Sequence, residues 1–86
     1  DEPVANLNAA NAAMSRGDME SAERFLDKAG SGPDADYARG VFHAKRKDYA
    51  KALEYFGKSD SDKARLASEK TQAIINHKGG IRYLTK

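Results

Sequence analysis

The sequence repeats weakly at an interval of 30 residues, and this repetition constrains the possible fold more than any other feature. Shifting residues 6–29 by that interval onto residues 36–59 brings four residues onto identical partners. The matched pairs are Arg16 with Arg46, Asp18 with Asp48, Ala22 with Ala52, and Lys28 with Lys58. A repeated unit of this length cannot bury its apolar face alone, so we expect successive units to stack on one another.

Within each unit the apolar residues are spaced as they are on one face of an α-helix. Leu7, Ala10 and Met14 follow an i, i+3, i+7 pattern, and the same spacing recurs between Met19 and Ala29. Fifteen alanines and few β-branched residues favour helix over strand. The pattern therefore predicts an all-α chain of about five helices joined by short turns.

Turn and cap residues indicate where these helices begin and end. Asp18 and Asp48 are favourable N-cap residues, and the Gly-Ser-Gly-Pro segment at 30–33 interrupts the helical pattern. The expected helices run up to Gly17 and then over about 19–29, 34–47, 49–56 and 61–78. Gly79 and Gly80 are expected to end the last helix, because glycine adopts the left-handed conformation without steric cost. Residues 79–86 would then form a short, frayed basic tail.

The composition limits the chain to one small domain. A chain of 86 residues has room for a single hydrophobic core. It contains no cysteine, which excludes a disulfide scaffold, thiolate chemistry and a cysteine-rich zinc site. It also has no run of about 20 apolar residues that could span a membrane. Nothing in the sequence predicts a cofactor.

Small residues fall at matching places in the two units. They are Ala10 and Gly40, Ala22 and Ala52, and Ala29 and Ser59. When Ala22 and Ala52 are taken as the twentieth position, this spacing resembles the tetratricopeptide repeat (TPR) family, which has small residues at positions 8, 20 and 27. Two helices approach closely at these positions, where a bulky side chain would push them apart.

The resemblance implies a TPR-like α-solenoid of antiparallel helix-turn-helix repeats. The implied units are repeat 1 at about 3–32, repeat 2 at about 33–60, a capping helix at about 61–78 and the basic tail at 79–86. The chain departs from the family where Arg39 holds position seven and His43 holds position eleven. Stacked repeats usually need three units or a cap, so a fragment of a longer array is an open interpretation.

In TPR proteins the first helix of each repeat, helix A, lines a groove that holds partner peptides. Carried over by position, the resemblance implies that the partner-binding residues are Leu7, Asn11, Met14, Tyr37, Val41 and Lys45. Val4, Ser15, Asp34 and Ala44 fall on the same implied face. The alternative is that the fifth helix covers these side chains and makes them part of the core. A carboxylate clamp, known from some TPR domains, is not supported, because Leu7 stands where its first lysine would be.

Other charged and titratable residues favour structural roles. Neither His43 nor His77 has a partner at metal-ligand spacing, so no metal site is predicted. His43 replaces an aromatic residue at a packing position, and His77 suits the end of a helix. The basic run at 45–47 could bind phosphate, but it equally complements the dipole of the third helix. No glycine-rich phosphate loop or catalytic motif occurs, and we expect no enzyme activity.

The sequence favours a non-enzymatic module that binds a peptide or protein on its A-helix face. The first alternative is a structural or self-associating spacer within a larger protein. Residues 1–29 carry six acids and three bases, and residues 60–86 carry three acids and six bases, so complementary ends could dock. Nucleic-acid binding is a weaker alternative, since the net charge is only +2. The acidic start of the chain is compatible with a bacterial envelope or periplasmic location, with the cytoplasm as the alternative.

Overall fold

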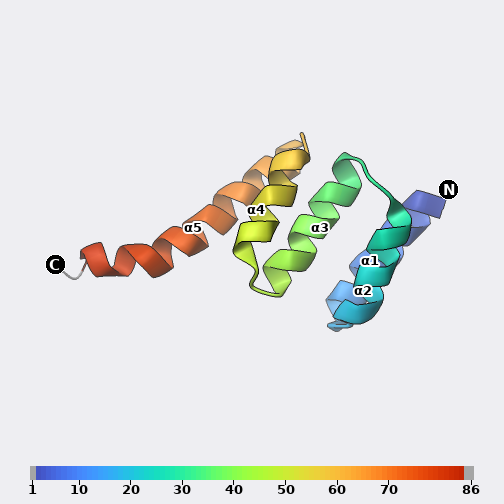
Figure 1. The fold of residues 1–86 in the computed structure, drawn as a ribbon, viewed down its shortest axis with the longest axis horizontal. Coiled ribbons are helices and arrows are strands. Elements are labelled where there is room, and N and C mark those ends of the chain that lie inside the picture. Colours follow the sequence, from blue (N-terminus) through green and yellow to red (C-terminus); the bar gives the residue numbers. More distant parts are fainter. Residues whose placement is uncertain (1, 85–86) are drawn as a thin grey trace.

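The chain folds into five α-helices connected by tight turns (Figure 1). The structure is a computed structural model that describes residues 2–84, with the side chains of residue 2 and residues 4–77. The helices are α1 (Glu2–Arg16), α2 (Met19–Ala29), α3 (Pro33–Lys45), α4 (Tyr49–Lys58) and α5 (Asp62–Leu84). All regular structure within the described residues is helical, as the sequence predicts. The molecule is elongated, with extents of 53 × 26 × 15 Å, and α5 extends away from the other helices.

The two predicted N-caps are present in the turns of both helical pairs. The Asp18 carboxylate accepts a hydrogen bond from the Ser21 backbone N–H at 3.1 Å, and Asp48 does the same for Lys51 at 3.4 Å. Each bond satisfies one of the backbone donors that a helix leaves free at its start. The residue before each cap has a positive φ, +81° at Gly17 and +66° at Lys47. The second turn therefore has the shape of the first, although a lysine replaces glycine there.

The last helix is longer than the sequence predicts. It was expected to end at Gly79-Gly80 and to leave a basic tail over 79–86, but α5 continues through both glycines to Leu84. The prediction was wrong because glycine permits a helix end without requiring one. A glycine inside a helix is less favourable than alanine by only about 1 kcal/mol. The two residues after Leu84 lie outside the described part of the chain.

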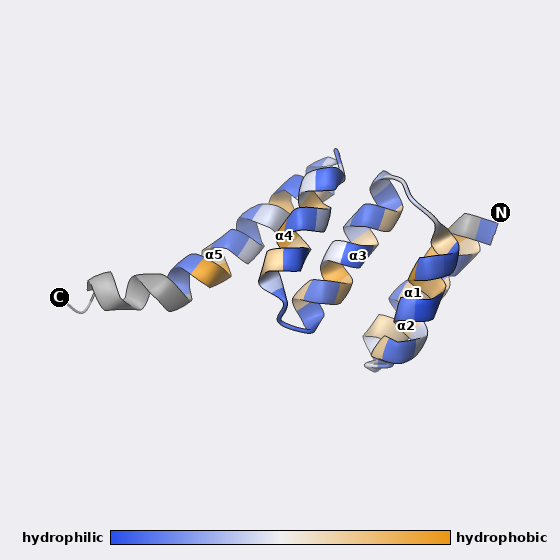
Figure 2. Ribbon diagram, viewed as in Figure 1, coloured by the Kyte–Doolittle hydropathy of each residue, from blue (hydrophilic) through white to orange (hydrophobic). Residues whose placement is uncertain are grey.

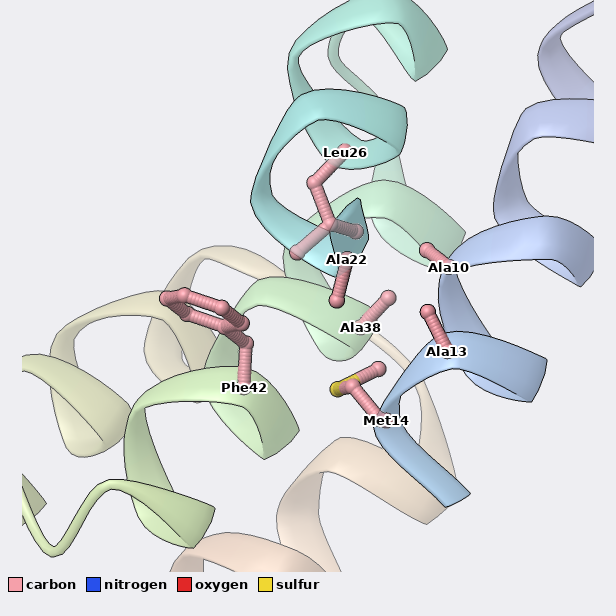
Figure 3. Close-up of a cluster of buried hydrophobic side chains, with 7 residues drawn as sticks. All are labelled: Ala10, Ala13, Met14, Ala22, Leu26, Ala38 and Phe42. Carbon is pink, nitrogen blue, oxygen red and sulfur yellow. The ribbon is translucent and has the colours of Figure 1, made fainter. Parts of the chain in front are cut away.

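Small residues lie where the helices cross. All six small residues at the matched positions of the two units are buried, as the spacing predicts: Ala10, Ala22, Ala29, Gly40, Ala52 and Ser59. Around the first of them, α1, α2 and α3 form a core cluster (Figure 3). Its buried members are Ala10, Ala13, Met14, Ala22, Leu26, Ala38 and Phe42. Short side chains dominate this cluster, so it depends on close backbone approach rather than on bulky apolar groups.

A second core cluster joins α4 and α5 to α3. Its buried members are Ala52, Phe56 and Ala64, and the partly buried side chains of Tyr37 and Val41 pack against it. Val41 also packs against the first cluster. The helix α3 therefore contacts both clusters and makes the core continuous along the molecule. Figure 2 shows hydrophilic residues alternating with hydrophobic ones along these helices.

Arg39, which departs from the family pattern, connects the two helical pairs. Its guanidinium donates hydrogen bonds to the backbone carbonyls of Leu26, at 2.7 Å, and of Gly30. Asp36 lies 3.8 Å from the same guanidinium, and both side chains are only 18% exposed. Carbonyls at the end of a helix lack internal partners, and a cation there also complements the helix dipole. Arg39 thus holds the end of α2 against α3.

We predict that Arg39→Met lowers the free energy of unfolding by about 1.5–3 kcal/mol, because two carbonyls lose a charged donor. Arg24→Met is the matched control, since Arg24 is 69% exposed and pairs only with Glu20 on its own helix. An exposed pair of this kind contributes about 0.5 kcal/mol or less. Chemical denaturation of both variants measures the difference. Equal losses in the two variants would contradict the bridging role of Arg39.

Two helical glycines give opposite predictions for substitution by alanine. A Cβ at Gly40 would lie 2.9 Å from Cζ of Phe56 and closer still to two other ring atoms, whereas a Cβ at Gly57 would meet nothing within 4 Å. We expect Gly40→Ala to lower the free energy of unfolding by about 1–3 kcal/mol through overpacking. Gly57→Ala should raise it by about 0.5–1 kcal/mol, because alanine favours the helix. Thermal unfolding that moves both variants in the same direction would contradict this account.

Candidate partner-binding face

A hollow of about 380 Å³ lies across α1, α3 and the start of α5. We call it the three-helix hollow. It is lined by Val4, Leu7, Asn8 and Asn11 from α1, by Asp34, Tyr37 and Ala38 from α3, and by Ser61 and Lys63 at the start of α5. These helices are the first of each predicted repeat together with the predicted capping helix, so the hollow lies on the implied A-helix face.

The apolar part of the hollow is held by the core beneath it. Leu7 packs against the first core cluster, and Tyr37 packs against the second, with its ring centroid 5.8 Å from that of Phe56. Val4 adds an aliphatic side chain that is 52% exposed. Because Leu7 and Tyr37 are each fixed on one side by packing, they present apolar surface to the hollow with little freedom to lose on binding.

Polar groups of different kinds surround this apolar surface. Asn8 and Asn11 are exposed on α1, where their side-chain amides can both donate and accept hydrogen bonds. Asp34 lies in the first turn of α3, where a carboxylate complements the helix dipole. Lys63 lies with its Nζ 5.9 Å from the centroid of the Tyr37 ring. The hollow therefore combines the apolar side chains of Val4, Leu7 and Tyr37 with amide groups and charges of both signs.

The hollow gathers three of the six residues implied for partner binding: Leu7, Asn11 and Tyr37. Val41 is half-buried against both core clusters, and Lys45 is exposed at the end of α3, outside the lining of the hollow. Met14 is 4% exposed and belongs to the first cluster (Figure 3). The expectation that Met14 contacts a partner is therefore corrected, because α2 and α3 both close over its side chain.

Four lining residues were not predicted from the sequence: Asn8, Ala38, Ser61 and Lys63. Asn8 could have been found, since it is one helical turn before Asn11. Ser61 and Lys63 depend on where α5 packs, which periodicity alone does not give. The start of α5 borders the hollow through Ser61 and Lys63.

His43 is held among aromatic rings on the other side of α3. Its ring stacks on Tyr55 with centroids 5.3 Å apart and planes 4° apart, and meets the edge of Phe42 at 5.2 Å. Burial lowers the pKa of His43 below its usual value, against the opposing pull of the Asp48 carboxylate. Among the side chains that the structure describes, no group of three His, Asp or Glu residues could hold a metal ion.

The basic run at 45–47 begins at the last residue of α3, and its Arg46 packs against Phe42 of the same aromatic group. The Arg46 guanidinium lies 5.6 Å from the centroid of the Phe42 ring, at a distance typical of a cation–π contact. The Arg46 backbone N–H donates to carbonyls in the last turn of α3. One of the three cations at 45–47 is therefore engaged with the helix that it follows.

Comparison with known proteins gives no family assignment. No protein-family model matches the sequence, and neither a curated protein nor a solved structure is significantly similar to it. The likeness to TPR proteins is thus carried by the residue pattern, with which the observed helices are compatible. Among the described residues, no helix is both long and apolar enough to cross a membrane.

We predict that the chain loses stability as the pH falls below about 6.5, the ordinary pKa of histidine, because of His43. The folded state disfavours the imidazolium, so the unfolded state takes up its proton first, near pH 6.5. The contribution of neutral His43 to the free energy of unfolding is therefore present above that pH. It is lost as the pH falls further, until His43 is protonated in the folded state too. His43→Phe should flatten this slope in urea titrations at several pH values. The exposed His77→Gln variant is the control, and loss of the slope in that variant would contradict the assignment.

Proposed function

We propose that this chain is a non-enzymatic interaction module that binds a segment of a partner protein in the three-helix hollow. The observation that carries the proposal is the joining of Leu7 and Tyr37, from two different helices, into one open apolar surface bordered by amides and charges. Side chains of this kind suit a peptide, whose apolar groups need burial and whose backbone needs hydrogen-bond partners.

The dimensions of the hollow favour an extended or single-helix segment over a small molecule. Packed helices lie about 8–10 Å apart, so a face made of three helices is about 20 Å wide. A stretch of about six extended residues covers that distance. The lining residues of the hollow come from all three of these helices. The absence of catalytic motifs from the sequence supports the non-enzymatic part of the proposal.

Binding in this hollow would depend mainly on apolar burial. Each partner side chain that becomes fully buried against Leu7 or Tyr37 would contribute about 1.5–3 kcal/mol before ordering costs. Tyr37 also packs against Phe56, so truncating it would change folding as well as binding. Asn11 is the better site for a test because it is exposed and lines the hollow. Its helix, α1, is packed into the core through Ala10 and Ala13.

We predict that Asn11→Arg weakens peptide binding by about tenfold or more, because a long side chain fills the hollow. Ala12→Arg is the matched control, since Ala12 is an exposed neighbour on α1 that does not line the hollow. Peptides would be selected on the wild-type chain by display, and their dissociation constants measured on all three proteins by fluorescence anisotropy. Selected peptides that bind the Asn11→Arg protein as tightly as the wild type would refute the proposed site.

A further inference from the structure

One face of α5 carries apolar and basic side chains that the five-helix core leaves exposed. Leu66 is 54% exposed and Ile74 is 42% exposed, and Lys63, Lys70 and His77 are exposed beside them. At 100° per residue these five residues fall within a sector of about 80° on the helix. We call this sector the α5 stripe. Ala64 and Thr71, which are buried, lie outside it.

Lys63, Leu66 and Lys70 of the α5 stripe lie beside Tyr37 of α3, and the last part of the stripe continues along the extension of the helix. The helix α4 has 10 residues, whereas α5 has 23 and extends well past its partner (Figure 1). An apolar part of this extension is visible in Figure 2 near the end of the described side chains. A helix that carries exposed aliphatic residues between lysines suits a partner surface that is acidic and also has an apolar contact to offer.

Such a surface exists on this same chain, on α2. Glu20, Glu23 and Asp27 are all exposed and lie within a sector of about 60°, on the side of the helix away from the buried Ala22 and Leu26. We call these three residues the acidic stripe. The Glu20 carboxylate also accepts a hydrogen bond from Arg24 at 3.2 Å. Beside the stripe is a shallow hollow of about 370 Å³, lined by Met19, Glu20, Glu23 and Arg46.

The two stripes match in spacing as well as in charge. Lys63 and Lys70 are seven residues apart on α5, and Glu20 and Asp27 are seven residues apart on α2. Seven residues rise about 10.5 Å along a helix, so both acids can face both lysines when the two helices lie side by side. Leu66 lies between the two lysines in the sequence, and Met19 lies beside the acids in the lining of the α2 hollow. Leu66 and Met19 would provide the apolar part of the contact.

We propose that a second copy of this chain docks its acidic stripe on the α5 stripe, giving a head-to-tail contact. The two stripes lie toward opposite ends of the molecule (Figure 1), so each docked copy still has one stripe free. A contact of this heterologous kind can be repeated beyond a dimer, giving a closed ring or an open chain according to the rotation between copies. A symmetric pairing of two α5 stripes is disfavoured, because it would place lysines beside lysines.

The contact is small, and its strength follows from its size. One helix lying on one helix buries less than the roughly 1,200 Å² that stable complexes usually need. The association should therefore be weak, with a dissociation constant on the order of 0.1 mM, and should weaken as salt screens the ion pairs.

The test uses two charge-reversal variants of the complete chain. Lys63→Glu/Lys70→Glu makes the α5 stripe acidic, and Glu20→Lys/Asp27→Lys makes the α2 stripe basic. Sedimentation velocity at about 0.01–1 mM protein should show wild-type mass rising with concentration in low salt and returning to that of a monomer in about 0.5 M salt. Each variant alone should associate about tenfold more weakly, since like charges then face each other. An equimolar mixture of the two should recover association, because each variant again meets its opposite charge.

Two further measurements make the result specific. Lys51→Glu/Arg65→Glu changes the net charge by the same amount at exposed residues outside the α5 stripe, and should associate like the wild type. Circular dichroism confirms that each variant is folded. The proposal is overturned by a wild-type chain that stays monomeric at about 1 mM, by variants that associate unchanged, or by a mixture that fails to recover association.

Discussion

The close approach of helices at small residues is the constraint on which the rest of this structure depends. At Gly40 there is no space for even a Cβ, because the Phe56 ring lies against the α3 backbone. Ala10, Ala22 and Ala52 are fully buried at the other crossings. With few bulky apolar residues available, the chain gains its burial by bringing backbones together, which increases dispersion contacts per residue. A larger side chain at Gly40 would push α4 away from α3, which lines the three-helix hollow.

The helix α3 connects this packing to the three-helix hollow. It contributes to both core clusters through Val41, and Arg39 fixes its distance from the end of α2. As a result, Tyr37 and Leu7 are held at a set separation although they are 30 residues apart in the sequence. A binding surface composed of side chains from neighbouring helices is only as well formed as the spacing of those helices. Stability and binding should therefore respond together to changes in α3.

The two proposed contacts use different surfaces but share one residue. Lys63 lines the three-helix hollow and also begins the α5 stripe. Its Nζ lies over the Tyr37 ring, which is itself part of the hollow. If a peptide occupied the hollow and a second copy occupied the stripe, they would compete for this lysine. Linkage then requires each ligand to weaken the other by the same factor.

The sequence by itself determined the local features of this protein. Helical periodicity and the Asp18 and Asp48 caps follow from interactions within a few residues, and the structure has them. The buried small residues were placed by the 30-residue repeat, which marks equivalent positions in the two units. The tertiary structure alone decided that Met14 is buried and that Lys63 lies beside Tyr37. Periodicity defines a helical face but leaves open which part of that face a neighbouring helix covers. That depends on crossing angles and distances set by the whole core.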